Sequence, residues 1–158
     1  MASGELDFGV ITTPAHPPGV GLRRVSLVEA PVGICVRDDD PLAGSDGVHW
    51  RDIDARPIVT MRSGTVLWEL LHRNVAHPDV VVEATAARTV RVMVGQGAGL
   101  GIIARLDTTA DVTGLVWIPL RDAPPLALCL TERRDSRPSR AALVVRQLIR
   151  ARADEMVV

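Results

Sequence analysis

Short apolar runs that alternate with helical segments are the feature of this sequence that most constrains its fold. Five such segments follow one another in the middle of the chain: the apolar runs 57–61, 79–84 and 100–104 and, between them, the helical segments 63–76 and 86–94. Four more apolar runs and one more helical segment flank this region, at residues 8–12, 25–37, 115–119, 126–131 and 138–154. Strands that alternate with helices form a largely parallel sheet covered on both faces. The sequence therefore predicts an α/β fold.

Composition limits the size, the compartment and the partners of the chain. Its 158 residues are 47% apolar, which is enough to bury the core of one domain or of two small lobes. The net charge of −1 provides no overall attraction for nucleic acid or for an anionic membrane. No apolar stretch approaches the ~18 residues of a membrane span, and no signal peptide is evident. Cys35 and Cys129 lie far apart within apolar runs, so we expect free buried thiols in a cytoplasmic protein.

A polar turn between an apolar run and a helix is the main candidate for a binding site. Ser63, Gly64 and Thr65 open the helical segment 63–76, directly after Arg62. The first N–H groups of a helix have no partner within it, and they favour a carboxylate nearby. Two hydroxyls and a guanidinium would add donors to such a site. The alternative, a Ser63 helix cap beside a solvated arginine, stays open on this argument.

Several other patterns are weaker than they first look. The glycines of residues 95–101 do not have the spacing of a dinucleotide-binding loop, and a helix precedes them where a strand should stand. The four histidines have no metal-ligand spacing, and no nucleophile motif is present. We therefore expect no catalytic residue, no metal and no cofactor. Seven arginines between Arg133 and Arg152 are typical of a solvated, salt-bridged helix face, although phosphate contact is an alternative.

The order of these segments, with their residues, resembles the effector-binding domain of LysR-type transcriptional regulators. Four stretches carry the resemblance: GELDFGVI at 4–11, VRDDDPLA at 36–43, VMVGQGAGLGII at 92–103 and PSRAA at 138–142. Together they cover nearly the whole chain in order, although no single one of them is specific. The sequence departs from the family pattern at Arg105, where the family usually has proline.

The resemblance implies a two-lobed fold of the type 2 periplasmic-binding-protein kind. Residues 35–129 would form a complete lobe two, and residues 1–34 with 130–158 would form a partial lobe one. The family's DNA-binding domain and the first strand–helix–strand of lobe one would be missing. The implied function is to sense a small molecule, a carboxylate or another anion, that binds between the lobes and so controls transcription.

The resemblance also implies which residues contact the effector. It places effector contacts in the turn of Arg62, Ser63, Gly64 and Thr65. Thr12 and Thr13, at the end of the first strand, would face the same cleft, with hydrogen bonding to backbone as their alternative role. Thr85 would cap the second helix and also line the cleft.

Two other classes of function are alternatives to this one. An enzyme on the same fold would need an acid/base or nucleophile pair, and a solute-binding protein would need a signal peptide. A third interpretation is an oligomerisation remnant that senses nothing. We further expect self-association, because a partial lobe one leaves strand edges uncovered, and contact with DNA only through the missing domain.

Overall fold

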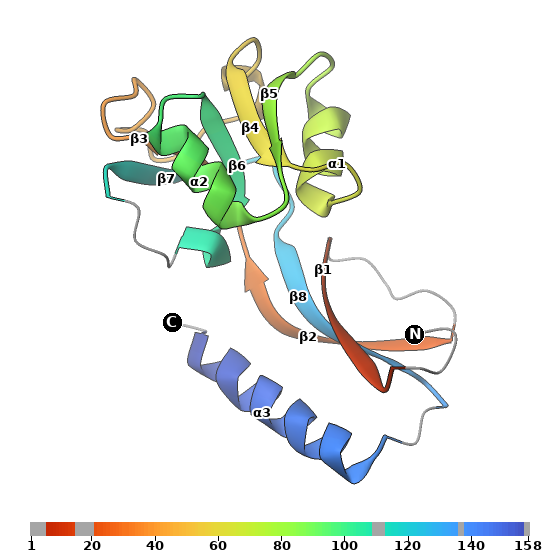
Figure 1. Cartoon of the computed structure of the whole chain (residues 1–158). Coiled ribbons are helices and arrows are strands. Elements are labelled where there is room, and N and C mark those ends of the chain that lie inside the picture. Colours follow the sequence, from red (N-terminus) through yellow and green to blue (C-terminus); the bar gives the residue numbers. More distant parts are fainter. Residues whose placement is uncertain (1–5, 15–20, 109–112, 136–137, 157–158) are drawn as a thin grey trace. The chain divides into compact units, whose positions relative to one another are not determined.

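The computed structural model describes residues 6–14, 21–108, 113–135 and 138–156 (Figure 1). The chain divides into two compact units. One consists of Met1–Ala30 and Pro125–Val158, and the other of Pro31–Pro124. The unit boundaries thus fall four or five residues before the expected lobe boundaries at 34/35 and 129/130. Assignment of the units to lobe one and lobe two stays a prediction.

The first unit is a three-stranded sheet with one helix. Its strands are β1 (Phe8–Pro14), β8 (Leu126–Arg133) and β2 (Leu22–Ala30), in that order across the sheet, and both pairings are antiparallel. The register between β2 and β8 shifts between Ser26 and Val28. The helix α3 (Arg140–Met156) packs against β2. An ion pair of 3.1 Å between Arg146 of α3 and Glu132 of β8 joins the helix to the central strand.

The second unit contains a five-stranded sheet in the order β5-β4-β6-β3-β7. The bounds of its strands are β3 (Val32–Arg37), β4 (Pro57–Met61), β5 (Asp79–Ala84), β6 (Leu100–Ala104) and β7 (Leu115–Pro119). β4 is parallel to β5 and β6, whereas β3 is antiparallel to both of its neighbours. The prediction of a largely parallel sheet is therefore confirmed for this unit, where β3 alone is antiparallel to the other four strands. It is wrong for the first unit, which is antiparallel throughout.

Two α-helices and two 3-10 helices complete the second unit. α1 (Val66–Asn74) packs on β4, and α2 (Ala87–Gly95) packs on β3, β4 and β6. The 3-10 helices are η1 (Trp50–Asp52) and η2 (Arg105–Thr108). Gly101 of β6 allows α2 to approach closely, because a Cβ there would lie 2.7 Å from the Val90 side chain. The core under α2 consists of the buried residues Cys35, Val59, Ala84, Val90, Val94 and Ile103.

The helix caps differ from those expected from sequence. α1 is capped by Thr65, whose hydroxyl accepts from the N–H of Trp68 at 3.4 Å, so a Ser63 cap is wrong. α2 is capped by Ala86 without a side-chain bond, so Thr85 precedes the cap and does not form it. After α2, Gly97 adopts the left-handed conformation that favours glycine, with φ of +82°.

The cysteines are free and buried, as the sequence indicated. Burial raises the pKa of the Cys35 thiol to about 11, an effect that the nearby Arg91 partly opposes. In the described part of the chain, no helix is long and apolar enough to cross a membrane.

Candidate functional site

The strand-to-helix turn after β4 and the end of β5 lie at one edge of the five-stranded sheet. β4 and β5 are parallel neighbours, with Met61 paired to Ala84, so the residues that follow them emerge side by side. The Arg62 N–H donates to the Ala84 carbonyl at 2.8 Å and holds the two strand ends together. Ligands in sheets of this kind bind beyond the carboxyl ends of parallel strands. The structure therefore brings together the five candidates of this unit: Arg62, Ser63, Gly64, Thr65 and Thr85.

Residues 62–65 form a tight, hydrogen-bonded turn. Both the N–H and the hydroxyl of Thr65 donate to the Arg62 carbonyl, at 3.3 Å and 2.8 Å. Gly64 has φ of +83°, a backbone conformation that favours glycine. A Cβ built on Gly64 would meet no atom within 4 Å, so the outer side of the turn is open. The exposed side chains of Arg62 and Ser63 and the open backbone at Gly64 form an accessible polar surface.

Glu83 is part of this turn, although the sequence did not indicate it. One carboxylate oxygen of Glu83 accepts from the Ser63 N–H at 3.2 Å, and the other accepts from the Trp68 indole N–H at 3.0 Å. The turn therefore already binds a carboxylate that the chain itself supplies. This carboxylate also offsets the positive end of the α1 dipole. Its contact with Ser63 spans 20 residues of sequence, and it depends on the pairing of β4 with β5.

An aromatic pair extends the turn along α1. The rings of Trp68 and His72 stack with centroids 3.8 Å apart and an interplanar angle of 21°. The His72 Nδ1 lies 2.9 Å from the Trp68 carbonyl oxygen, and this contact fixes the ring over the indole. Glu83, Trp68 and His72 thus form one connected cluster beside Ser63.

Thr12 and Thr13 lie on β1 of the first unit. Thr13 is half-buried, and its hydroxyl accepts from the Arg24 guanidinium of β2 at 3.3 Å. Thr12 is exposed. This contact of Thr13 is to a side chain, and the roles of Thr12 and Thr13 as effector contacts or as partners of the backbone stay predictions.

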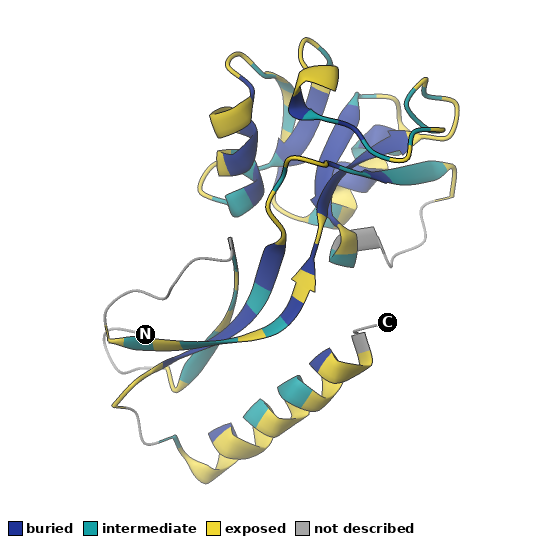
Figure 2. Cartoon of the chain, turned by 180° about the vertical axis from the view of Figure 1, so that it is seen from behind, coloured by how far each residue is buried: buried dark blue, intermediate teal, exposed yellow. Residues whose placement is uncertain are grey.

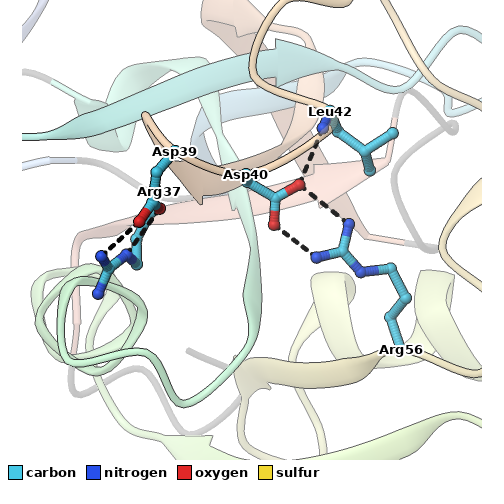
Figure 3. A network of polar contacts seen from close by, with 5 residues as sticks. All are labelled: Arg37, Asp39, Asp40, Leu42 and Arg56. Atoms are coloured by element: carbon cyan, nitrogen blue, oxygen red, sulfur yellow. Dashed lines mark hydrogen bonds and ion pairs between the residues drawn. The ribbon is translucent and has the colours of Figure 1, made fainter.

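The acidic segment after β3 is occupied by arginines. Figure 3 shows Arg56 donating to both oxygens of Asp40, while the Leu42 N–H also donates to Asp40 at 2.9 Å. The Arg56 guanidinium and the Leu42 N–H hold the pKa of Asp40 below its usual range. Arg37 donates to both oxygens of Asp39, at 2.9 Å and 2.6 Å. The carboxylates of Asp39 and Asp40 are therefore bound by arginine side chains of the same chain.

Some of the histidines and some of the C-terminal arginines have local partners. His49 lies 3.4 Å from the carboxylate of Asp122, and His16 falls outside the described residues. Across the described ranges, no three His, Cys, Asp or Glu side chains gather as a metal site would require. On α3, Arg146 pairs with Glu132 and Arg152 pairs with Glu155. Two arginines of the segment thus form ion pairs, and a solvated, salt-bridged face for the whole segment stays a prediction.

Comparison with known proteins identifies the family. The model of the LysR substrate binding domain matches residues 1–154. A search among curated proteins found no match. Among solved structures, the chain resembles HinK, a LysR family transcriptional regulator from Pseudomonas aeruginosa, with 15% identity and a TM-score of 0.73. That match covers 99% of this chain and 56% of HinK, so the chain spans little more than half of that regulator.

Two regulatory domains are covered more fully. The CcmR regulatory domain of Synechocystis PCC6803, solved in complex with 2-PG, has a TM-score of 0.76 and 16% identity over 99% of this chain and 77% of its own. The reduced OxyR regulatory domain from Pseudomonas aeruginosa has a TM-score of 0.75 and 19% identity. That match covers 95% of this chain and 75% of the OxyR domain. These likenesses confirm the periplasmic-binding-protein-like fold. Because the family model covers nearly all of the sequence, the chain belongs to the LysR substrate-binding domain family.

Proposed function

We propose that this domain binds an anionic small-molecule effector at the turn of Arg62, Ser63, Gly64 and Thr65, with Thr85 beside it. The observation that carries the proposal is the carboxylate of Glu83, which accepts from the Ser63 N–H. A turn that holds an internal carboxylate has donors suited to an external one. The neighbouring guanidinium of Arg62 would add a charge-assisted hydrogen bond, which is stronger than a neutral one.

Glu83 and the effector would compete for the same donor. An effector carboxylate that reaches the Ser63 N–H must displace the Glu83 oxygen from 3.2 Å. The absence of a side chain at Gly64 leaves room for this approach, since no atom lies within 4 Å of a Cβ built there. No covalent chemistry is needed, because binding alone can shift the population of conformations.

The wider parts of the proposal rest on the family. The CcmR domain of the same fold is described in complex with 2-PG, which supports small-molecule binding by such domains. We keep Thr12 and Thr13 as effector contacts on the resemblance alone. We also propose that the intact regulator is a cytoplasmic homo-oligomer that reaches DNA through another domain. The free thiols of Cys35 and Cys129 support the cytoplasmic location, because disulfides are rare in a reducing compartment.

Calorimetric titration with a panel of small carboxylates and phosphates tests the site. For a compound that binds the wild type, Arg62→Ala should weaken affinity about ten- to a hundredfold, the equivalent of ~1.5–3 kcal/mol for a hydrogen bond to a charged ligand. Glu83→Gln should bind more tightly than wild type, because a neutral amide competes less well for the Ser63 N–H.

Arg73→Ala is the matched control. Arg73 is an exposed arginine in the last turn of α1, so its removal changes net charge equally without touching the turn. Binding by Arg62→Ala and Glu83→Gln with wild-type affinity would place the effector elsewhere. Equal losses in Arg62→Ala and Arg73→Ala would show a general charge effect and would also contradict the proposed site.

A further inference from the structure

An apolar groove lies between α3 and the three-stranded sheet of the first unit, and we call it the α3 groove. Its volume is about 410 Å³, within the range of about 300–1,000 Å³ that is typical of small-molecule sites. Val10, Leu27 and Leu128 line it from the three strands β1, β2 and β8. Leu27 lies at the point where the register of β2 shifts. The sheet side of the groove is therefore apolar across all three strands.

The helix side of the α3 groove is apolar with one charged position. Val145, Leu148 and Arg152 are three or four residues apart, so they lie on one side of α3, and all three line the groove. Val145 and Leu148 are 45% and 64% exposed, and Figure 2 shows exposed residues along much of the helix. In the described part of the chain, Arg152 is the only charged residue that lines the groove. The groove thus combines an apolar lining with one cationic group toward the C-terminal end of α3.

The guanidinium of Arg152 has a partner that a ligand could replace. Its Nη1 donates to a carboxylate oxygen of Glu155, and the two side chains are 77% and 62% exposed. An exposed ion pair of this kind contributes little free energy, because solvent screens it. Arg146 differs, since its partner Glu132 lies 3.1 Å away and is only 9% exposed. A ligand carboxylate can therefore replace Glu155 on Arg152 at little cost, whereas Arg146 stays paired with Glu132.

We propose that the α3 groove binds a medium-chain alkyl carboxylate, with its chain against the apolar lining and its carboxylate paired with Arg152. The distance along α3 from Val145 to Arg152 is about 10 Å, from a rise of 1.5 Å per residue. Bonds of about 1.5 Å at tetrahedral angles advance an extended chain by roughly 1.3 Å per carbon, so about eight carbons span the groove. Burial of apolar surface drives this binding, and the guanidinium selects an anionic head group. The site belongs to the first unit and does not depend on the proposed effector turn.

Calorimetric titration of the full 158-residue chain with straight-chain carboxylates, each below the concentration at which it forms micelles, tests the chemistry of the groove. Affinity should rise about two- to fourfold for each CH2 added from hexanoate to octanoate, because each CH2 removes further apolar area from water. The rise should stop near decanoate, whose chain is longer than the groove. Octanol and octylamine are the controls for the head group. Octanol should bind about two- to fivefold more weakly than octanoate, and octylamine more weakly still.

Two matched pairs of variants locate the ligand. Leu148→Asp should weaken octanoate binding about tenfold, because it removes apolar lining and adds a carboxylate. Val144→Asp, at a 55% exposed position that does not line the groove, should bind as the wild type does. Arg152→Ala should weaken binding about two- to fivefold, whereas Arg140→Ala, which removes the same charge from the start of α3, should leave it unchanged. Glu155→Gln should tighten binding, because Arg152 loses its internal carboxylate partner.

Each other outcome overturns the proposal. An affinity that keeps rising beyond decanoate, or that is equal for octanoate and octanol, would indicate adsorption without a defined site. Equal losses in Leu148→Asp and Val144→Asp, or in Arg152→Ala and Arg140→Ala, would show a general charge effect. Loss of octanoate binding in Arg62→Ala but not in Leu148→Asp would place the compound at the effector turn. Binding by none of the carboxylates would exclude this class of ligand. Circular dichroism of each variant confirms that it is folded.

Discussion

The two units bury their apolar residues to very different degrees. In the second unit, β3 has five consecutive buried residues from Val32 to Val36, and all five residues of β6 are buried. Among the described residues, two large apolar side chains are exposed in the second unit and six in the first. The six of the first unit are Leu6, Val10, Leu143, Val144, Val145 and Leu148. The second unit therefore buries most of its apolar side chains, whereas the first leaves more of its large apolar side chains exposed.

The difference follows from the number of layers. Helices α1 and α2 pack on the five-stranded sheet, and strands buried on both faces become continuous apolar runs. The three-stranded sheet has α3 packed along β2, with an open groove beside it. Large apolar side chains are thus more often exposed in the first unit than in the second, and substitutions can measure this contrast.

The largest contrast should come from truncating one leucine in each unit. Leu71 of α1 is fully buried, whereas Leu148 of α3 is 64% exposed. Leu71→Ala should lower the free energy of unfolding by about 2–5 kcal/mol, because it removes buried methyl groups and leaves a cavity. Leu148→Ala should change it by less than about 0.5 kcal/mol in the monomer. Denaturant titration at low protein concentration measures both, and similar losses would refute the contrast.

Ion pairs should show a smaller contrast of the same kind. Asp40 and Arg56 of the second unit have side chains 14% and 31% exposed, whereas Arg152 and Glu155 of α3 are 77% and 62% exposed. Asp40→Asn should cost about 1–2 kcal/mol, because a bidentate, half-buried pair is lost. Glu155→Gln should leave monomer stability close to that of the wild type, because solvent screens an exposed pair.

The Asp40 contribution should also depend on pH. Arg56 lowers the pKa of Asp40 in the folded state, so this stabilisation is present above the unfolded pKa of about 3.9 and is lost as the pH falls through the folded value. The difference in unfolding free energy between wild type and Asp40→Asn should therefore shrink below about pH 4. A difference that stays constant from pH 7 to pH 3 would show that the Asn variant is destabilised for another reason.

The smallest expected effect separates the two hydroxyls of the candidate turn. Thr65→Ala should cost about 0.5–1 kcal/mol, the lower part of the range for caps, because its bond to the Trp68 N–H is long at 3.4 Å. Ser63→Ala should be close to neutral, since Ser63 contributes its backbone N–H and not a cap. Thermal unfolding of the two variants measures this difference. A larger loss in Ser63→Ala would restore the cap that the sequence favoured.

Most of the strands could be predicted from the sequence, because their period and their turns are local. The bounds of β4, β5, β6 and β7 agree with the apolar runs to the residue. The caps could not be predicted, since Ser63, Thr65 and Thr85 are all suitable residues and only the backbone path selects Thr65. The direction of β3 was not predicted either, because the apolar run 25–37 contains parts of two strands, β2 and β3, that belong to different sheets.

The candidate turn could be predicted from local chemistry, but its contact with the Glu83 carboxylate could not. Arg62, Ser63, Gly64 and Thr65 are consecutive, and a polar turn between a strand and a helix is visible in sequence. Glu83 reaches Ser63 only because β5 pairs with β4, and no pattern in residues 79–84 indicates that contact. Sequence therefore indicated where donors would gather, while the fold showed which acceptor already uses them.

The amide NMR spectrum of the labelled domain, titrated with the panel of small carboxylates and phosphates, tests the central claim most directly. An effector that binds the proposed turn should shift the amides of Ser63, Gly64, Thr65 and Thr85, together with the indole N–H of Trp68 as Glu83 is displaced. Shifts that saturate at these groups are the predicted result. Saturating shifts confined to the α3 groove, with the Ser63 amide and the Trp68 indole unmoved, would contradict the account.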